Sequence, residues 1–343
     1  MACSKPFRLL QLPSLAHDVI FSLMDIGDVY HLSKCSSRSR YAVKMFTRLQ
    51  TYFFSITADQ SCYFLRISSD GGTGGKKTFF ELRYRDAVDD PMLVPHCRDN
   101  WAVTQKEILY LLDVFTRQVN RLHFYYATKV IETTEFLKRA TSFSVDIVYY
   151  CNDATIINDK VYKYVLKEFK NSKTLHISAP PSSEFRFDDM EPFTGESISI
   201  NAADWMTVDH LVHCFPNVEK MSLYMGTEEC LLTPQLMPQF FNTWRNGSRM
   251  RDLQLECDWS NIDFQAMFEN IPKTVMKRVE VKSKKQVFKE GKCFLIRQEE
   301  SGVEAIAYRC YHNFYFTTDF RLLRDDESDG DNYDSDDEMY LMF

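Results

Sequence analysis

The sequence predicts a mixed α/β fold, α+β overall, in which three short N-terminal helices precede a repeat-like α/β domain that ends in antiparallel strands. Three observations predict this: helical spacing of apolar residues within residues 12–49, a helix-turn-strand unit recurring from about residue 104, and strand-like alternation after residue 272. The 343-residue chain is 45% hydrophobic and 26% charged, so it can bury a core and is expected to form at least two domains.

The first fifty residues predict three short helices. Pro13 opens the first, because its fixed φ suits a first helical turn. Leu15, Val19 and Leu23 recur at helical spacing, and Asp28 is the expected N-cap of the second helix. A third apolar face follows before residue 50. Helices this short cannot bury their apolar faces alone, so the partner is either the rest of this chain or another protein.

Residues 51–85 predict three strands separated by turns. The glycine-rich stretch 70–77 lacks the Gly and the Ser or Thr that a phosphate-binding loop places around its Gly-Lys, so it is interpreted as a hairpin loop. Further strands are expected near residues 124, 145, 176, 199, 222, 254 and 280, at a mean spacing of about 26 residues. That spacing is typical of leucine-rich repeats, although their usual Asn is absent. A degenerate leucine-rich-repeat-like solenoid and an irregular α/β domain both remain open.

Helix starts in this region are predicted from capping residues. Thr104 begins a capping box with Glu107, and Asp159, Thr207 and Thr233 are expected to begin three further helices. Beyond residue 272 the pattern changes to short alternating segments with Gly-containing turns, which predict an antiparallel sheet that ends the domain.

Charge and cysteine usage limit the classes of partner. The net charge is −7, but residues 325–338 alone hold nine acidic and no basic residues, so residues 325–343 are expected to form an acidic disordered tail. The remainder is close to neutral and has no basic stripe, so nucleic acid is not an expected partner. Ten scattered cysteines without a Cys-x-x-Cys pair indicate reduced thiols and a cytoplasmic or nuclear location. No apolar run reaches the roughly 18 residues of a membrane span, and no signal peptide is expected.

No group of residues predicts catalysis. His210, His213 and Cys214 come nearest to a site, but zinc needs four ligands at defined spacing, so the two histidines are interpreted as surface residues beside an apolar stripe. We therefore expect a protein that is not an enzyme, without catalytic residues, metal or cofactor.

The N-terminal helices also contain an ordered series of short motifs: Leu12-Pro13, Ile20-Phe21, Met24-Asp25, Asp28-Val29, Leu32 and Cys35-Ser36. This order resembles an F-box, the helical module by which substrate receptors dock onto the Skp-type adaptor of cullin-RING ubiquitin ligases. Two positions depart from the family pattern, with Leu15 where an acidic residue is usual and Ser39 where many members have an aromatic residue. The adaptor-binding residues that the resemblance implies are Leu12, Pro13, Ile20, Phe21, Met24, Val29, Leu32 and Cys35.

A second resemblance concerns the C-terminal part of the chain. The run from Trp244 through Asn246-Gly247 to Ser248, followed by a Leu-Gln-Leu strand at 253–255, is similar to the type 2 F-box-associated domain expanded in nematodes. The later apolar segments at 294–297, 305–307 and 314–316 resemble the end of that domain.

These resemblances imply an F-box at residues 1–50, a β-rich connecting region at 51–100, and a substrate-recognition domain of the F-box-associated type at 101–324. They imply a substrate-recognition subunit of an SCF-type ligase, with a Skp-type adaptor and an unknown target protein as partners. The alternative is a non-catalytic leucine-rich-repeat-like scaffold whose N-terminal helices only cap the solenoid. Exposed apolar surface on residues 12–46 favours the receptor, and full burial of it favours the scaffold.

Overall fold

The chain divides into two compact units in the computed structural model, Met1–Asp153 and Ala154–Phe343. The residues that the structure describes are 12–59, 62–69, 78–85, 100–140, 145–151, 158–225, 232, 235–256, 264–268, 270–275, 278–282, 286–289, 293–310 and 313–323. The predicted acidic tail, the glycine-rich stretch 70–77 and the predicted N-cap Thr233 lie outside them.

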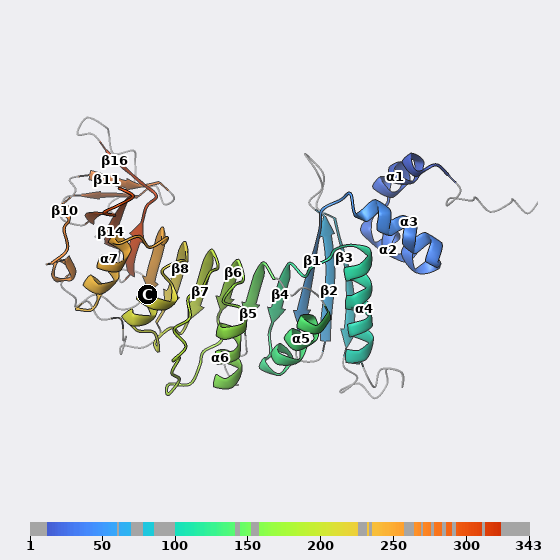
Figure 1. The fold of residues 1–343 in the computed structure, drawn as a ribbon, viewed down its shortest axis with the longest axis horizontal. Coiled ribbons are helices and arrows are strands. Elements are labelled where there is room, and N and C mark those ends of the chain that lie inside the picture. Colours follow the sequence, from blue (N-terminus) through green and yellow to red (C-terminus); the bar gives the residue numbers. More distant parts are fainter. Residues whose placement is uncertain are drawn as a thin grey trace, which may run out of the picture. The chain divides into compact units, whose positions relative to one another are not determined.

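The first unit begins with three helices, α1 (Ser14–Leu23), α2 (Ile26–Cys35) and α3 (Ser37–Thr47) (Figure 1). A sheet follows in the spatial order β5-β4-β1-β2-β3. Its strands are β1 (Tyr52–Ala58), β2 (Cys62–Ser69), β3 (Thr78–Arg85), β4 (Arg121–Phe124) and β5 (Ile147–Tyr150). The predicted region 51–85 thus joins the same sheet as the first strand of the repeat region, because β1 pairs with β4 in parallel and with β2 in antiparallel.

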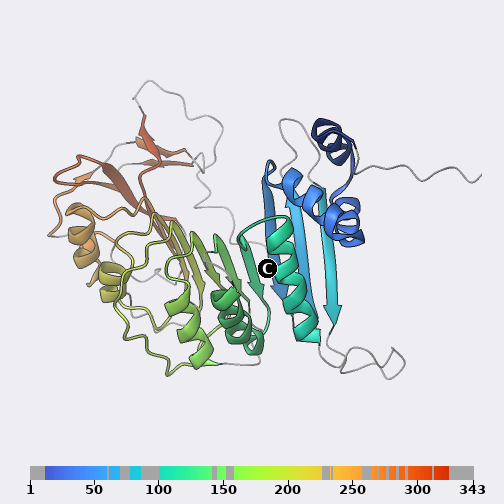
Figure 2. The ribbon, with the colours of Figure 1, turned by 45° about the vertical axis from the view of Figure 1, so that its right-hand side comes forward.

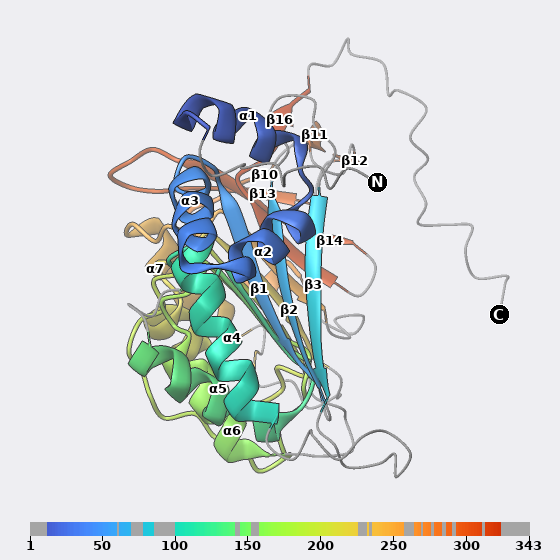
Figure 3. The ribbon, with the colours of Figure 1, turned by 90° about the vertical axis from the view of Figure 1, so that its right-hand side faces the viewer.

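Two longer helices, α4 (Asn100–Val114) and α5 (Ala127–Ala140), cover one face of this sheet (Figure 3). Burial alternates along β1 and β2, as expected of a sheet covered on one face. Phe54, Ile56 and Leu65 are buried, whereas Ser55 and Phe64, next to them along the strands, are partly exposed. Trp101 of α4 stacks on Tyr63 at 4.8 Å between ring centroids, which fixes the helix over β2. The opposite face of the sheet has no helix on it in the described part of the unit.

The second unit continues the helix-turn-strand pattern. Helix α6 (Asp159–Glu168) precedes four parallel strands in sequential order, β6 (Thr174–Ile177), β7 (Ser197–Asn201), β8 (Lys220–Tyr224) and β9 (Asp252–Glu256) (Figure 2). The connections carry the π-helical turn His210–Cys214 and helix α7 (Met237–Arg245). The strand positions expected from residue 124 to residue 254 lie within strands, except that the one near 145 precedes β5 by two residues. The order of these parallel strands supports the repeat-like arrangement.

The unit ends in antiparallel strands, as predicted. Strand β9 pairs with β15 (Asn313–Thr317), followed outward by β14 (Glu304–Cys310), β13 (Cys293–Arg297) and the short β10 (Thr274–Val275). A separate three-stranded sheet holds β11 (Arg278–Val281) between β12 (Gln286–Lys289) and β16 (Phe320–Leu322). The strand expected near residue 280 therefore leaves the parallel series, because its partners are antiparallel. The short 3-10 turn Ala266–Phe268 lies between β9 and β10.

The motif that begins at Trp244 has a structural role. The Trp244 side chain is fully buried, its indole Nε1 donates to the carbonyl of Met250 at 2.8 Å, and its ring meets Phe316 edge-on. Gly247 adopts φ 119°, a conformation that favours glycine over residues with a Cβ. The buried amide of Gln298 then donates to the carbonyls of Trp244 and Ser248, so it ties β13's end to the turn.

Two local predictions need correction, and one helix was missed. The N-cap of α2 is Asp25, not Asp28, since its carboxylate accepts the Asp28 amide at 2.7 Å. Helix α4 begins before Thr104, whose side chain is fully buried inside the helix, because the packing of Trp101 extends the helix toward its N-terminus. Helix α5 was not predicted.

A close backbone approach fixes Gly195 in the second unit. A Cβ placed there would lie 2.1 Å from the backbone oxygen of Ser172, far inside van der Waals contact. Glycine is therefore required at this position, where the segment before β7 crosses the turn between α6 and β6. In the described part of the chain, no helix has both the length and the apolar character that crossing a membrane requires.

Candidate functional site

The three N-terminal helices are held at their ends by local caps. Asp25 caps α2, and Ser36 caps α3 by accepting the Ser39 amide at 3.0 Å. The Ser39 hydroxyl in turn accepts the Ser36 amide at 2.8 Å, which completes a reciprocal capping box. Ser39, which replaces the aromatic residue of many F-box sequences, is buried and serves this cap.

A small core joins the helices to one another. Phe21 of α1 meets Phe46 of α3 edge-on at 5.3 Å, and Val29 of α2 is buried as well. Two of the predicted adaptor-binding residues, Phe21 and Val29, therefore have side chains only 1% and 2% exposed. Their contribution in this conformation is to the packing that holds the helices together.

The other predicted residues lie nearer the surface. Pro13 and Cys35 are exposed, and four are half-buried: Leu12, Ile20, Met24 and Leu32.

The largest exposed apolar side chains of this region form two stripes, each with four-residue spacing. The α1 stripe consists of Leu15, Val19 and Leu23, which are 61% to 82% exposed. The α3 stripe consists of Tyr41 and Met45 of α3 and of Leu49, two residues beyond the end of the helix; they are 44% to 74% exposed. Residues four apart share one side of a helix, so the α1 stripe is a continuous apolar surface, as is the Tyr41–Met45 part of the α3 stripe. Sequence reasoning recognised the spacing of Leu15, Val19 and Leu23 but did not assign them to a docking surface.

Other side chains of α2 anchor the helices to β3 and α4. The Tyr30 ring packs on Phe80 of β3 at 4.7 Å, and its hydroxyl donates to Glu107 of α4 at 3.0 Å. The Lys34 ammonium donates to the same carboxylate at 2.9 Å and lies 3.5 Å from the ring centroid of Tyr110. Burial is the main cause that raises the pKa of Tyr30, so its hydroxyl keeps its proton and remains a donor.

Helix α3 makes a second anchor on α4. Asp113 accepts hydrogen bonds from Lys44 and from Arg40, the latter at 2.8 Å, and the Thr47 hydroxyl donates to the carbonyl of Val114. The hydrogen bond from Lys44 is the main cause that lowers the pKa of the Asp113 carboxyl. These two anchors fix α2 and α3 on the sheet of the first unit and leave the two stripes exposed.

The two histidines that come nearest to a metal site, His210 and His213, lie in different environments. His210 is buried rather than at the surface, which corrects the prediction, whereas His213 is exposed. The His210 Nδ1 accepts the Thr207 amide at 3.0 Å, so the proton lies on Nε2, which donates to the Phe187 carbonyl at 2.8 Å. Both ring nitrogens of His210 thus form hydrogen bonds within the protein. Among the described residues, no three His, Cys, Asp or Glu side chains converge as metal ligands would.

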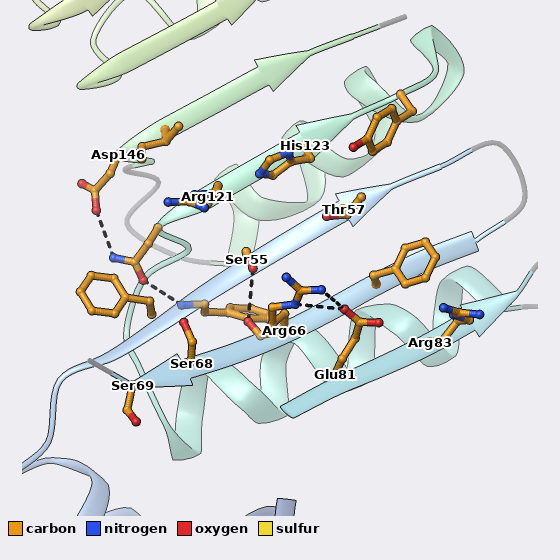
Figure 4. A pocket seen from close by; sticks show the side chains of 16 residues that line it. Ser55, Thr57, Arg66, Ser68, Ser69, Glu81, Arg83, Arg121, His123 and Asp146 are labelled. Carbon is orange, nitrogen blue, oxygen red and sulfur yellow. Dashed lines mark hydrogen bonds and ion pairs between the residues drawn. The ribbon is translucent and has the colours of Figure 1, made fainter. Parts of the chain in front are cut away.

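A hollow of about 830 Å³ lies on the face of the first unit's sheet opposite α4 and α5 (Figure 4). Outward-facing side chains of β1 to β4 line it, among them Arg66, Arg83, Arg121 and His123. The structure thus has two surfaces suited to binding: the exposed stripes of α1 and α3, and this hollow.

Comparison with known protein families gives a match for the N-terminal helices that carry the two stripes. No curated protein and no solved structure matches the chain. The F-box domain family matches residues 9–51, which span α1 to α3. The predicted F-box at the N-terminus is therefore confirmed, and it precedes a mixed α/β region with a large sheet that ends in antiparallel strands.

Proposed function

We propose that this chain is the substrate-recognition subunit of an SCF-type cullin-RING ubiquitin ligase, in which the F-box docks on the Skp-type adaptor. The observation that carries this proposal is the exposure of the α1 stripe within the matched F-box. Such a stripe costs free energy in water, and a protein partner that covers it recovers that cost. Helices that only capped the sheet would bury this face, so the exposure supports the receptor over the scaffold.

In this proposal the chain supplies proximity, not catalysis. The chain would bring a captured target to the ligase, while other subunits of the ligase transfer ubiquitin; the anchors on α4 hold the F-box helices on the first unit. The role is consistent with a cytoplasmic or nuclear location.

We further propose that the C-terminal region is a type 2 F-box-associated domain and that it contributes to target binding. The buried Trp244 and the Gly247 turn, which the similar motif contains, support this assignment. The experimental structure of a protein with an established type 2 F-box-associated domain would test this assignment. A different strand order from the one seen in residues 197–322 would contradict the assignment.

Co-elution of the full chain with a purified adaptor–cullin complex in gel filtration tests the receptor role. The parent chain should co-elute, and a variant with Val19→Glu and Leu23→Glu should not. Because both residues are exposed, the variant should keep the circular dichroism spectrum of the parent. A matched control changes two exposed apolar residues of α4, Val103→Glu and Leu109→Glu, and should co-elute as the parent does. Separate elution of a folded parent chain would contradict the proposal.

A further inference from the structure

The hollow on the first unit's sheet consists of two rows of side chains that cross the strands. Strand register places Arg121, Ser55, Arg66 and Glu81 side by side in one row. The next row lies two residues along each strand and contains, in order from β4 to β3, His123, Thr57, Phe64 and Arg83. Since side chains two apart share a face, both rows point away from the covering helices and into the hollow (Figure 4).

Two arginines of these rows form no ion pair with a carboxylate among the described residues. Arg66 already binds Glu81, through Nε at 3.0 Å and Nη2 at 2.5 Å. The guanidinium of Arg83 lies 4.7 Å from the ring centroid of Phe64 and forms no ion pair with any described residue. Arg121 is exposed and is likewise without an ion pair among the described residues. The Asp146 carboxylate at the rim is bonded to the amide of Asn120.

Strands β1 and β2 lie between the two cations. They contribute Ser55, Thr57, the Phe64 ring and Arg66, whose charge is paired with that of Glu81. His123 lies on the same strand as Arg121, and burial, together with the fields of Arg121 and Arg66, lowers its pKa to about 4, so His123 is neutral at physiological pH. The hollow therefore presents positive charge at two separated points, with the Phe64 ring and a neutralised arginine between them.

We propose that this hollow binds an acidic segment of the target protein, with one carboxylate on Arg121, a second on Arg83 and an apolar side chain between them. The inference rests on the receptor role proposed above, since it names the class of target. Arg121 and Arg83 are three strands and two residues apart, which is about 16 Å between their backbones at typical sheet spacings. An extended chain advances roughly 3.3 Å per residue, so the two acidic residues should lie about five positions apart. Bidentate pairing with guanidinium favours carboxylates at both points.

Peptide binding to the full-length chain tests this inference without any adaptor. The probe is a fluorescein-labelled peptide that carries two glutamates five positions apart with a phenylalanine between them, and binding is read as fluorescence anisotropy at low salt. A variant with Arg83→Gln and Arg121→Gln should bind it about tenfold more weakly, since two solvent-exposed ion pairs are lost and each contributes about threefold. The matched control replaces two exposed arginines of the same unit outside the hollow, Arg48→Gln and Arg117→Gln, and should bind as the parent does.

Two further peptides complete the test. A peptide with the same composition and adjacent glutamates should bind more weakly than the probe. A peptide with the sequence of residues 325–338 reports whether the chain's own acidic tail is the better occupant. Three results would each overturn the proposal. The first is that the control variant loses as much binding as the variant of Arg83 and Arg121, and the second is that the probe binds no better than the peptide with adjacent glutamates. The third is that the tail peptide is the one peptide whose binding depends on Arg83 and Arg121. Because no adaptor is present, any of these results leaves adaptor docking to be judged by its own experiment.

Discussion

Removal of the Glu107 carboxylate should loosen the F-box from the sheet of the first unit. Glu107 accepts from Tyr30 at 3.0 Å and from Lys34 at 2.9 Å, and only 12% of its side chain is exposed. A hydrogen bond to a charged group stabilises by about 1.5 kcal/mol, and a partly exposed ion pair adds about 0.5 kcal/mol. Glu107→Ala should therefore cost the F-box helices about 2 kcal/mol, or roughly a thirtyfold change in their opening equilibrium.

Native-state hydrogen exchange measures this opening directly. Amides of α2 and α3 in the Glu107→Ala chain should exchange about thirtyfold faster, while amides of α6 in the second unit stay unchanged and act as an internal reference. Lys106→Ala is the control, because Lys106 is the exposed neighbour of Glu107 on the same helix. A change below about threefold in α2 and α3 would refute the claim that this carboxylate anchors the F-box.

Three other predictions follow from single contacts. Because the pKa of Asp113 is lowered below 3.8 in the folded chain, its contribution to stability is present above that pH and is lost as the pH falls through the folded pKa. Asp113→Asn should thus lower the urea midpoint of α3 unfolding at pH 6, and by progressively less as the pH falls below 3.8; an effect that does not shrink with falling pH would contradict the contact. Gly195→Ala should destabilise the second unit by about 2 kcal/mol or more in urea denaturation, since the new methyl group would overlap a backbone oxygen, and an unchanged midpoint would contradict the close approach. Arg121→Gln should raise the pKa of His123 above about 4, measured by NMR titration, because one of two nearby cations is removed; an unchanged pKa would contradict the proximity of the two side chains.

Local patterns in the sequence predicted the elements well. The three N-terminal helices and the F-box they form, the strands from 52 to 85, and the parallel strands up to residue 254 lie where spacing, caps and alternation placed them. Each of these signals acts within a few residues, so one sequence is enough to recognise it. The Asn246-Gly247 turn after α7 is of the same kind, because a positive φ favours glycine at one position.

Contacts between distant residues were not predictable in the same way. Phe21 and Val29 are buried because α1, α2 and α3 pack on one another, which a linear motif does not report. Thr104 lies inside α4 because Trp101 packs on Tyr63 across the unit. Arg83 and Arg121 line one hollow only because β1 pairs with β2 on one side and with the distant β4 on the other, while β2 pairs with β3; β3 and β4 are separated by 35 residues that include α4.

The most direct test of the account is the affinity of the full chain for the purified Skp-type adaptor, measured by isothermal titration calorimetry. The parent should bind, and the variant with Val19→Glu and Leu23→Glu should bind at least about a hundredfold more weakly, since each change would bury an unpaired carboxylate in an apolar interface. The α4 control with Val103→Glu and Leu109→Glu should keep the parent affinity. Equal affinity of the α1 variant and the parent, or no heat of binding from a folded parent chain, would contradict the claim that the exposed α1 stripe of the F-box is the adaptor-docking surface.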